Sequence, residues 1–82
     1  MKVQKKMKDF ASKELYGEFV LKAVDKGSVV RMRVNYPDVK KGELGTVDHK
    51  DGDVSNVLCI TFSGKLLQVY SYHVDVVTSV LR

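Results

Sequence analysis

The fold of this chain is decided by Gly42-Glu43-Leu44-Gly45-Thr46-Val47, the turn Asp51-Gly52-Asp53, and the run Val57-Leu58-Cys59-Ile60-Thr61-Phe62. The first stretch places two glycines three residues apart around a short apolar strand, and the Asp-Gly turn leads from it into the β-rich run. Glycine permits positive φ angles and close approach of two backbones, which a tightly bent antiparallel sheet requires. We therefore predict that this region forms the middle of a small barrel.

The composition is that of one small globular domain. The chain has 82 residues, of which 44% are hydrophobic and 29% are charged, enough for a single modest core. Its one cysteine, Cys59, cannot form an intramolecular disulfide, so we expect a reducing, cytoplasmic location. No apolar segment follows the basic start, and no apolar run reaches the roughly eighteen residues of a membrane span, so we expect neither secretion nor a membrane partner.

The positive charge is concentrated near the N-terminus. The net charge is +4, and residues 1–26 hold seven lysines against four acidic residues, a net of +3, whereas residues 27–82 hold seven Lys or Arg against six acidic residues, a net of +1. A basic excess of this kind invites a nucleic-acid interpretation. We divide the chain into a basic N-terminal helical segment, residues 1–26, and a β-barrel, residues 27–82.

The N-terminal segment shows apolar residues at helical spacing in two stretches. Residues 3–11 carry one apolar stripe and predict a short basic helix or a frayed arm. Ser12 is a good N-cap for a second helix over residues 13–25. One half of its wheel holds Leu15, Tyr16, Phe19, Val20, Ala23 and Val24.

Two glycines, Gly17 and Gly27, have predicted places in this second helix, and a strand is the alternative to it. Gly17 falls on its polar side, where glycine costs about 1 kcal/mol relative to alanine. Gly27 is suited to be the left-handed residue that ends the helix. The alternative is a strand over residues 18–24, with residues 25–27 as a hairpin turn.

From Ser28 onward the period changes to two. Val30, Met32 and Val34 alternate with Arg31 and Arg33, which predicts a half-buried strand with both arginines on its exposed face. Further strands are predicted at residues 44–48, 57–62, 66–71 and 74–81, joined by short turns. The fold class is therefore mainly β: a five-stranded small barrel preceded by an N-terminal helical segment. The expected core is Val30, Met32, Val34, Val47, Leu58, Ile60, Phe62, Leu67 and Val69, with Lys65 exposed.

Residues 27–77 resemble the SH3-like small barrels in the broad sense, the class that includes KOW and Tudor-like modules. The resemblance rests on Gly27-Ser28-Val29-Val30-Arg31, on residues 41–47, on the strand ending at Phe62, and on the turn Ser63-Gly64-Lys65. Several small proteins of bacteria, phages and mobile elements look like this. The chain has no tryptophan and no Ala-Leu-Tyr-Asp-Tyr-like segment, so the resemblance does not extend to recognition of proline-rich peptides.

No group of residues specifies a reaction. His49, His73 and Cys59 are too few for a structural zinc site, and the acidic cluster Asp48, Asp51 and Asp53 lacks the ligand order of an EF-hand. His73 and Asp75 lie two residues apart but have no activated nucleophile to serve, and no phosphate-binding glycine loop is present. We predict a protein that is not an enzyme, with no catalytic residue, metal, cofactor or small-molecule substrate.

The candidate binding residues are aromatic and basic. They are Arg31, Arg33, Tyr36, Lys40, Lys41, Tyr70 and Tyr72. Aromatic rings can stack on bases and cations can meet phosphates, so we predict a nucleic-acid-binding module. One alternative is that the tyrosines cap the core while the arginines solvate a face. The other is a protein-interaction or self-association module that docks through residues 3–11, where Met7 and Phe10 would enter a partner groove.

Overall fold

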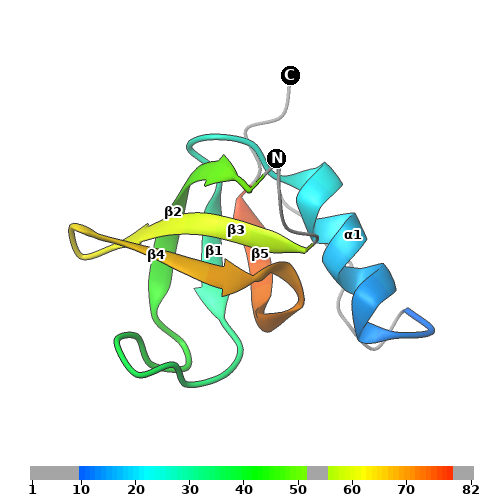
Figure 1. The fold of residues 1–82 in the computed structure, drawn as a ribbon, viewed down its shortest axis with the longest axis horizontal. Coiled ribbons are helices and arrows are strands. Elements are labelled where there is room, and N and C mark those ends of the chain that lie inside the picture. The colour runs from blue at the N-terminus through cyan, green and yellow to red at the C-terminus, as the bar shows by residue number, and fades with distance from the viewer. Residues whose placement is uncertain (1–9, 52–55, 79–82) are drawn as a thin grey trace.

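The computed structural model describes residues 10–51 and 56–78. Helix α1 (Lys13–Ala23) precedes five strands: β1 (Val29–Met32), β2 (Leu44–Lys50), β3 (Val57–Phe62), β4 (Lys65–Tyr70) and β5 (Val74–Thr78). A short 3-10 turn, η2 (Ser71–His73), joins β4 to β5 (Figure 1). This arrangement confirms the prediction of a mainly β fold with a helix before the strands.

The strands form one antiparallel sheet in the order β4-β3-β2-β1-β5. The pairing of β2 with β3 shifts register between Val47 and His49, an irregularity of the kind that bends a strand. Figure 1 shows β3 and β4 running across the direction of β1, β2 and β5. The order leaves β4 and β5 as the two edge strands.

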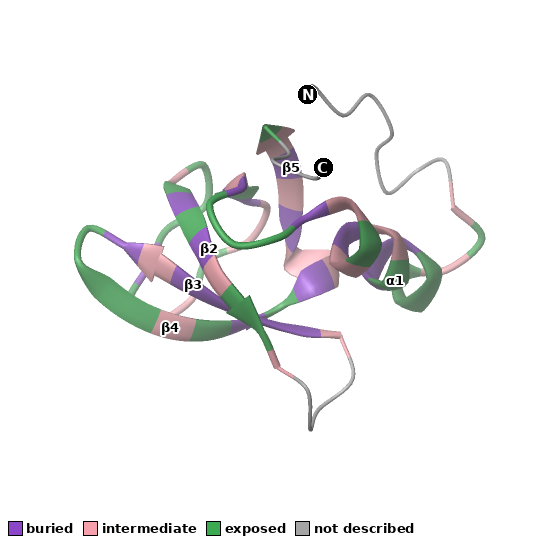
Figure 2. Cartoon of the chain, turned by 90° about the horizontal axis from the view of Figure 1, so that it is seen from above, coloured by how far each residue is buried: buried purple, intermediate pink, exposed green. Residues whose placement is uncertain are grey.

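The core lies inside the bent sheet and under α1. Seven of the nine predicted core residues are buried, and the other two, Val34 and Leu67, are partly buried against the same cluster. The helix adds Tyr16, Val20 and Val24, each 0% exposed. Figure 2 shows the buried residues of α1 on the side that faces the strands. The helix is therefore part of the same core as the sheet.

Gly45 is required by a close approach of two strands. A Cβ atom on Gly45 would lie 2.5 Å from Cε1 of Phe62 and 2.6 Å from Cγ2 of Ile60. Its neighbour Gly42 has a φ of 91°, a left-handed conformation that other residues rarely adopt. The two glycines in the fold-deciding stretch thus serve different needs, one of space and one of backbone conformation.

The helix starts as predicted but ends earlier. The Ser12 hydroxyl accepts a hydrogen bond from the Leu15 amide at 3.2 Å, which confirms the N-cap. The chain is extended at Val24, so the predicted extension to residue 25 is wrong. The role given to Gly27 is also wrong, because its φ of 94° belongs to a turn in which Ser28 N donates to Asp25 O at 3.0 Å. The alternative strand over residues 18–24 is excluded by α1 itself.

The placement of Gly17 on a polar side of the helix is wrong. Gly17 is buried, and a Cβ there would lie 2.7 Å from Oγ of Ser71 and 3.2 Å from Cγ of Asn56. The absence of a side chain lets α1 approach η2 closely. A helical wheel displays only the helix, so it cannot show a second element packed on its other side.

Three predicted segments lie partly outside the described residues. These are residues 3–9 of the basic helix or arm, Gly52 and Asp53 of the predicted turn, and residues 79–81 of the last predicted strand. Phe10 is described, and its ring centroid lies 5.3 Å from that of Tyr16 and 5.2 Å from that of Phe19. Its ring therefore packs on the chain's own helix.

Across residues 10–51 and 56–78, the structure contains no helix with the length and apolar character to cross a membrane.

Candidate functional site

Tyr36 is held in a well-anchored loop between β1 and β2. Gly42 N donates to Met32 O at 2.8 Å at the base of this loop, and Tyr36 N donates to Val39 O at 2.7 Å within it. Val39 is 1% exposed and fixes the loop to the core. The Tyr36 side chain therefore projects from a rigid support.

The Tyr36 hydroxyl connects the loop to the end of β4. It accepts a hydrogen bond from the Tyr70 amide at 3.1 Å and lies 2.9 Å from Nδ1 of His73. Burial, with the positive charges of Arg33 and Lys13, lowers the pKa of His73. Burial also raises the pKa of Tyr36. The two pKa shifts favour a neutral imidazole and a neutral phenol, and in the tautomer that carries its proton on Nε2 the His73 Nδ1 accepts a hydrogen bond from the Tyr36 hydroxyl.

Four rings form one aromatic cluster, which consists of Tyr36, Tyr70, Tyr72 and His73. Tyr70 and Tyr72 stack with their ring centroids 5.1 Å apart. His73 meets all three tyrosines edge-on, with centroid distances of 5.6 Å to Tyr36, 5.7 Å to Tyr70 and 4.7 Å to Tyr72. These geometries are those that aromatic pairs prefer. His73 is thus the centre of the cluster.

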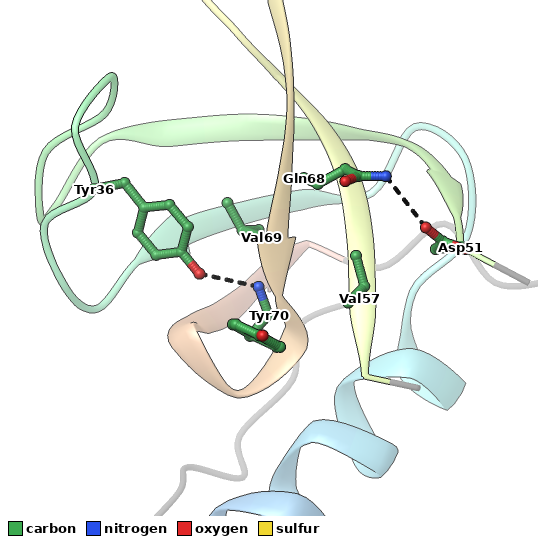
Figure 3. A pocket seen from close by; sticks show the side chains of 6 residues that line it. All are labelled: Tyr36, Asp51, Val57, Gln68, Val69 and Tyr70. Atoms are coloured by element: carbon green, nitrogen blue, oxygen red, sulfur yellow. Dashed lines mark hydrogen bonds between the residues drawn. The ribbon is translucent and has the colours of Figure 1, made fainter. Parts of the chain in front are cut away.

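A pocket of about 240 Å³ opens beside this cluster at the C-terminal end of β4. We call it the β4-end pocket; it is lined by Tyr36, Asp51, Val57, Gln68, Val69 and Tyr70 (Figure 3). The side-chain Nε2 of Gln68 donates a hydrogen bond to Oδ2 of Asp51 at 3.2 Å, which orients the carboxylate. Among these described lining residues only Asp51 is charged, so the pocket combines aromatic and apolar walls with a carboxylate.

Arg33 was predicted to be exposed, and this is wrong. Its side chain is 29% exposed: Nη1 donates to Tyr72 O at 2.6 Å, and Nε lies 3.6 Å from Oδ1 of Asp75. The same carboxylate oxygen accepts a hydrogen bond from the Tyr16 hydroxyl at 2.7 Å. Burial of Tyr16, with this bond, raises the pKa of the phenol well above its usual value. Arg33 therefore fastens η2 to β5 and α1.

The other predicted cations lie apart from the β4-end pocket. Arg31 is exposed on β1, where it is the register partner of Leu44 and Asp75. Lys40 and Lys41 are exposed in the loop that carries Tyr36, and the Lys41 amide donates to Oδ1 of Asn35 at 2.8 Å. The structure thus brings together the tyrosines and Arg33, and places no predicted cation among the described pocket residues.

For two residues of the site, His73 and Asp51, the sequence indicated only other roles. His73 was paired with Asp75, but its Nδ1 faces Tyr36 while Asp75 is engaged by Tyr16 and Arg33. Asp51 was considered as a calcium ligand and lies instead in the pocket wall. Residues 10–51 and 56–78 hold no group of three or more His, Cys, Asp or Glu that could bind a metal ion. The run Tyr70-Ser71-Tyr72-His73 carried a usable signal, because three rings in four residues at a strand end mark a surface.

Comparison with known proteins identifies one family. The family model described as "Mouse development and cellular proliferation protein Cullin-7" matches residues 7–79, which is nearly the whole chain. A search of the curated proteins found no match.

Proposed function

The chain belongs to the Cullin-7 family, and we propose that it is a protein-interaction module that binds its partner at the aromatic cluster and the β4-end pocket. The observation that carries this proposal is the exposure of Tyr70. Its side chain remains 46% exposed although it stacks on Tyr72 and borders the pocket. Tyrosine is enriched where protein interfaces carry most of their binding energy.

The rigidity of the site supports the proposal. Tyr36 is fixed by its loop, and both of its neighbours, the Tyr70 amide and His73, are hydrogen-bonded to its hydroxyl. Binding usually has to overcome the entropy lost when side chains become ordered. Rings that are already held in place lose less of this entropy, so a partner can bind them more tightly.

Nucleic-acid binding has weaker support. Arg33 is engaged by Tyr72 O and Asp75, and the charged residue among the described pocket residues is the acidic Asp51. A phosphate backbone requires cations gathered on one surface. The SH3-like resemblance and docking through residues 3–11 stay predictions, although the packing of Phe10 on Tyr16 and Phe19 engages one ring of that stripe.

Affinity capture with matched variants tests the proposal. Immobilised wild-type chain, Tyr70→Ala and Leu44→Ala are compared in extracts of the source cells; Leu44 is 51% exposed on β2 and does not line the pocket. We expect to capture proteins that bind wild type and Leu44→Ala equally well. Their captured amount should fall about tenfold or more with Tyr70→Ala, because truncating a tyrosine at the centre of an interface costs about 2 kcal/mol or more of binding free energy. Equal capture by all three chains, or captured material that nuclease removes, would contradict the proposal.

A further inference from the structure

Strand β4 is an edge strand whose outer side is open along most of its length. It pairs with β3 through six consecutive residue pairs, from Val57↔Tyr70 to Phe62↔Lys65, without a shift in register. An edge strand presents a row of N–H and C=O groups that another strand can pair with. Figure 2 shows β4 exposed over most of its residues.

The Tyr70 amide reveals which backbone groups face outward. It donates to the Tyr36 hydroxyl rather than to β3, so it points away from the sheet. Outward groups alternate along an antiparallel strand, and the unbroken register places those of Leu66 and Gln68 on the same side as Tyr70. In the described part of the chain, the backbone groups of Leu66 and Gln68 on that side have no hydrogen-bond partner.

This edge lacks the usual protection against pairing. Proteins shield edge strands with charges, proline, bulges or a covering element. The only charge on β4 is Lys65 at its start, and Leu66 is 54% exposed. The opposite edge differs, because β5 lies beside α1 (Figure 1).

The β4-end pocket adds a chemical preference at the end of this edge. Gln68, Val69 and Tyr70 belong to both the edge strand and the pocket wall. The pocket offers two tyrosine rings, two valines and one carboxylate. Aromatic faces and a carboxylate attract a cation, and valine side chains suit the methylene stem of a lysine or arginine.

We propose that the partner is an extended segment that adds as a strand along the outer edge of β4 and places a Lys or Arg side chain in the β4-end pocket. This proposal rests on the proposed function and names the form and charge of the partner. Main-chain hydrogen bonds to Leu66 and Gln68 would supply affinity, and the pocket would supply specificity. The Tyr70 amide already donates a hydrogen bond to the Tyr36 hydroxyl, so pairing with the added strand would end before Tyr70.

Hydrogen exchange of the full chain tests the pairing. The probe is a phage-displayed library of random ten-residue peptides, from which peptides that bind wild type are synthesised. We expect the selected peptides to be rich in Lys and Arg. On binding, they should slow exchange at the Leu66 and Gln68 amides about tenfold or more, while the Leu67 and Val69 amides, which face β3, are slow in both states.

Three variants separate the edge from the pocket. Gln68→Pro removes an outward N–H at a position where an edge strand tolerates proline, and Gln68→Ala removes the same side chain but keeps the N–H. Because the Gln68 side chain orients Asp51, we expect Gln68→Ala to weaken peptide binding no more than about tenfold and Gln68→Pro, which also lacks the N–H, to abolish it. Asp51→Asn keeps the shape of the pocket without its charge, and it should weaken binding of basic peptides about tenfold.

The outcomes distinguish this inference from the proposed function. If peptides bind but protect residues other than Leu66 and Gln68, the inference fails and the proposed function stands. If no peptide binds and affinity capture is also unchanged by Tyr70→Ala, both fail. Protection of Leu66 and Gln68 that rises with protein concentration alone would assign the edge to a second copy of the chain and overturn the inference. If Gln68→Pro does not fold, protection of the Leu66 and Gln68 amides in wild type decides whether the partner pairs with β4.

Discussion

His73 acts as the organising residue of the site because its ring contacts three tyrosines and its Nδ1 is hydrogen-bonded to the hydroxyl of one of them, Tyr36. Burial, with the positive charges of Arg33 and Lys13, lowers its pKa in the folded chain and so favours the neutral imidazole. The sequence could not reveal this role. Tyr36 and His73 are separated by 37 positions, and only the pairing of β1 with β5 and the course of the loop bring them together.

The lowered pKa of His73 predicts a loss of stability on acidification. Unfolding restores the ordinary value of 6.5, so the unfolded chain binds the proton more readily than the folded chain. The contribution of His73 is therefore fully present above about pH 6.5 and is lost as the pH falls below it. We expect the free energy of unfolding by urea to fall less between about pH 7 and pH 5 in His73→Gln than in wild type.

His49→Gln is the matched control for this measurement. His49 is exposed on β2, where its Nδ1 lies 2.7 Å from Oδ2 of Asp48 and far in sequence from the cluster. We expect this variant to keep the part of the pH dependence that His73 supplies. The same slope in wild type and His73→Gln would contradict the role given to His73.

At the scale of the elements, period and capping predicted most of the structure. Alternation located β1 and β4, apolar or β-branched runs bounded by turns located β2, β3 and β5, and Ser12 located the start of α1. The errors concern contacts between elements: Gly17 packs on Ser71, and Arg33 belongs to a strand face by period but turns toward η2. A local pattern states which side of an element is apolar, and it does not state which other element arrives there.

Arg33 and Arg31 should differ in their effect on stability although the alternation treats them alike. Arg33→Ala removes a charged donor from Tyr72 O at 2.6 Å and leaves Asp75 with one partner fewer. We expect it to lower the free energy of unfolding by about 1–3 kcal/mol. Arg31→Ala, on the exposed face of β1, should change it by less than about 0.5 kcal/mol. Equal midpoints in urea for the two variants would show that the Arg33 contacts do not stabilise η2.

At the scale of the whole molecule, the helix and the sheet depend on one another. The sequence separated residues 1–26 from residues 27–82 on charge and period, and that separation follows a real change in local pattern. The core, however, contains residues from both segments. Tyr16, Val20 and Val24 are each 0% exposed in the same cluster as Val30, Leu58 and Ile60. Composition along a chain reports local character, whereas a core is defined by contacts between distant segments.

A chain of residues 27–82 should therefore not fold cooperatively. It would lack three fully buried side chains, and large-to-small changes at such positions cost about 2–5 kcal/mol each. The sum is comparable with the total of about 5–15 kcal/mol that stabilises a small domain. We expect no sigmoidal urea transition and weak near-ultraviolet dichroism for residues 27–82, and a normal transition for residues 10–82, which keep every core residue named here. A cooperative transition in residues 27–82 would mean that the sheet forms its own core and that α1 only rests upon it. In that case the approach of α1 to η2 at Gly17 would be dispensable for the shape of the aromatic cluster, and partner binding at Tyr70 would survive removal of the helix.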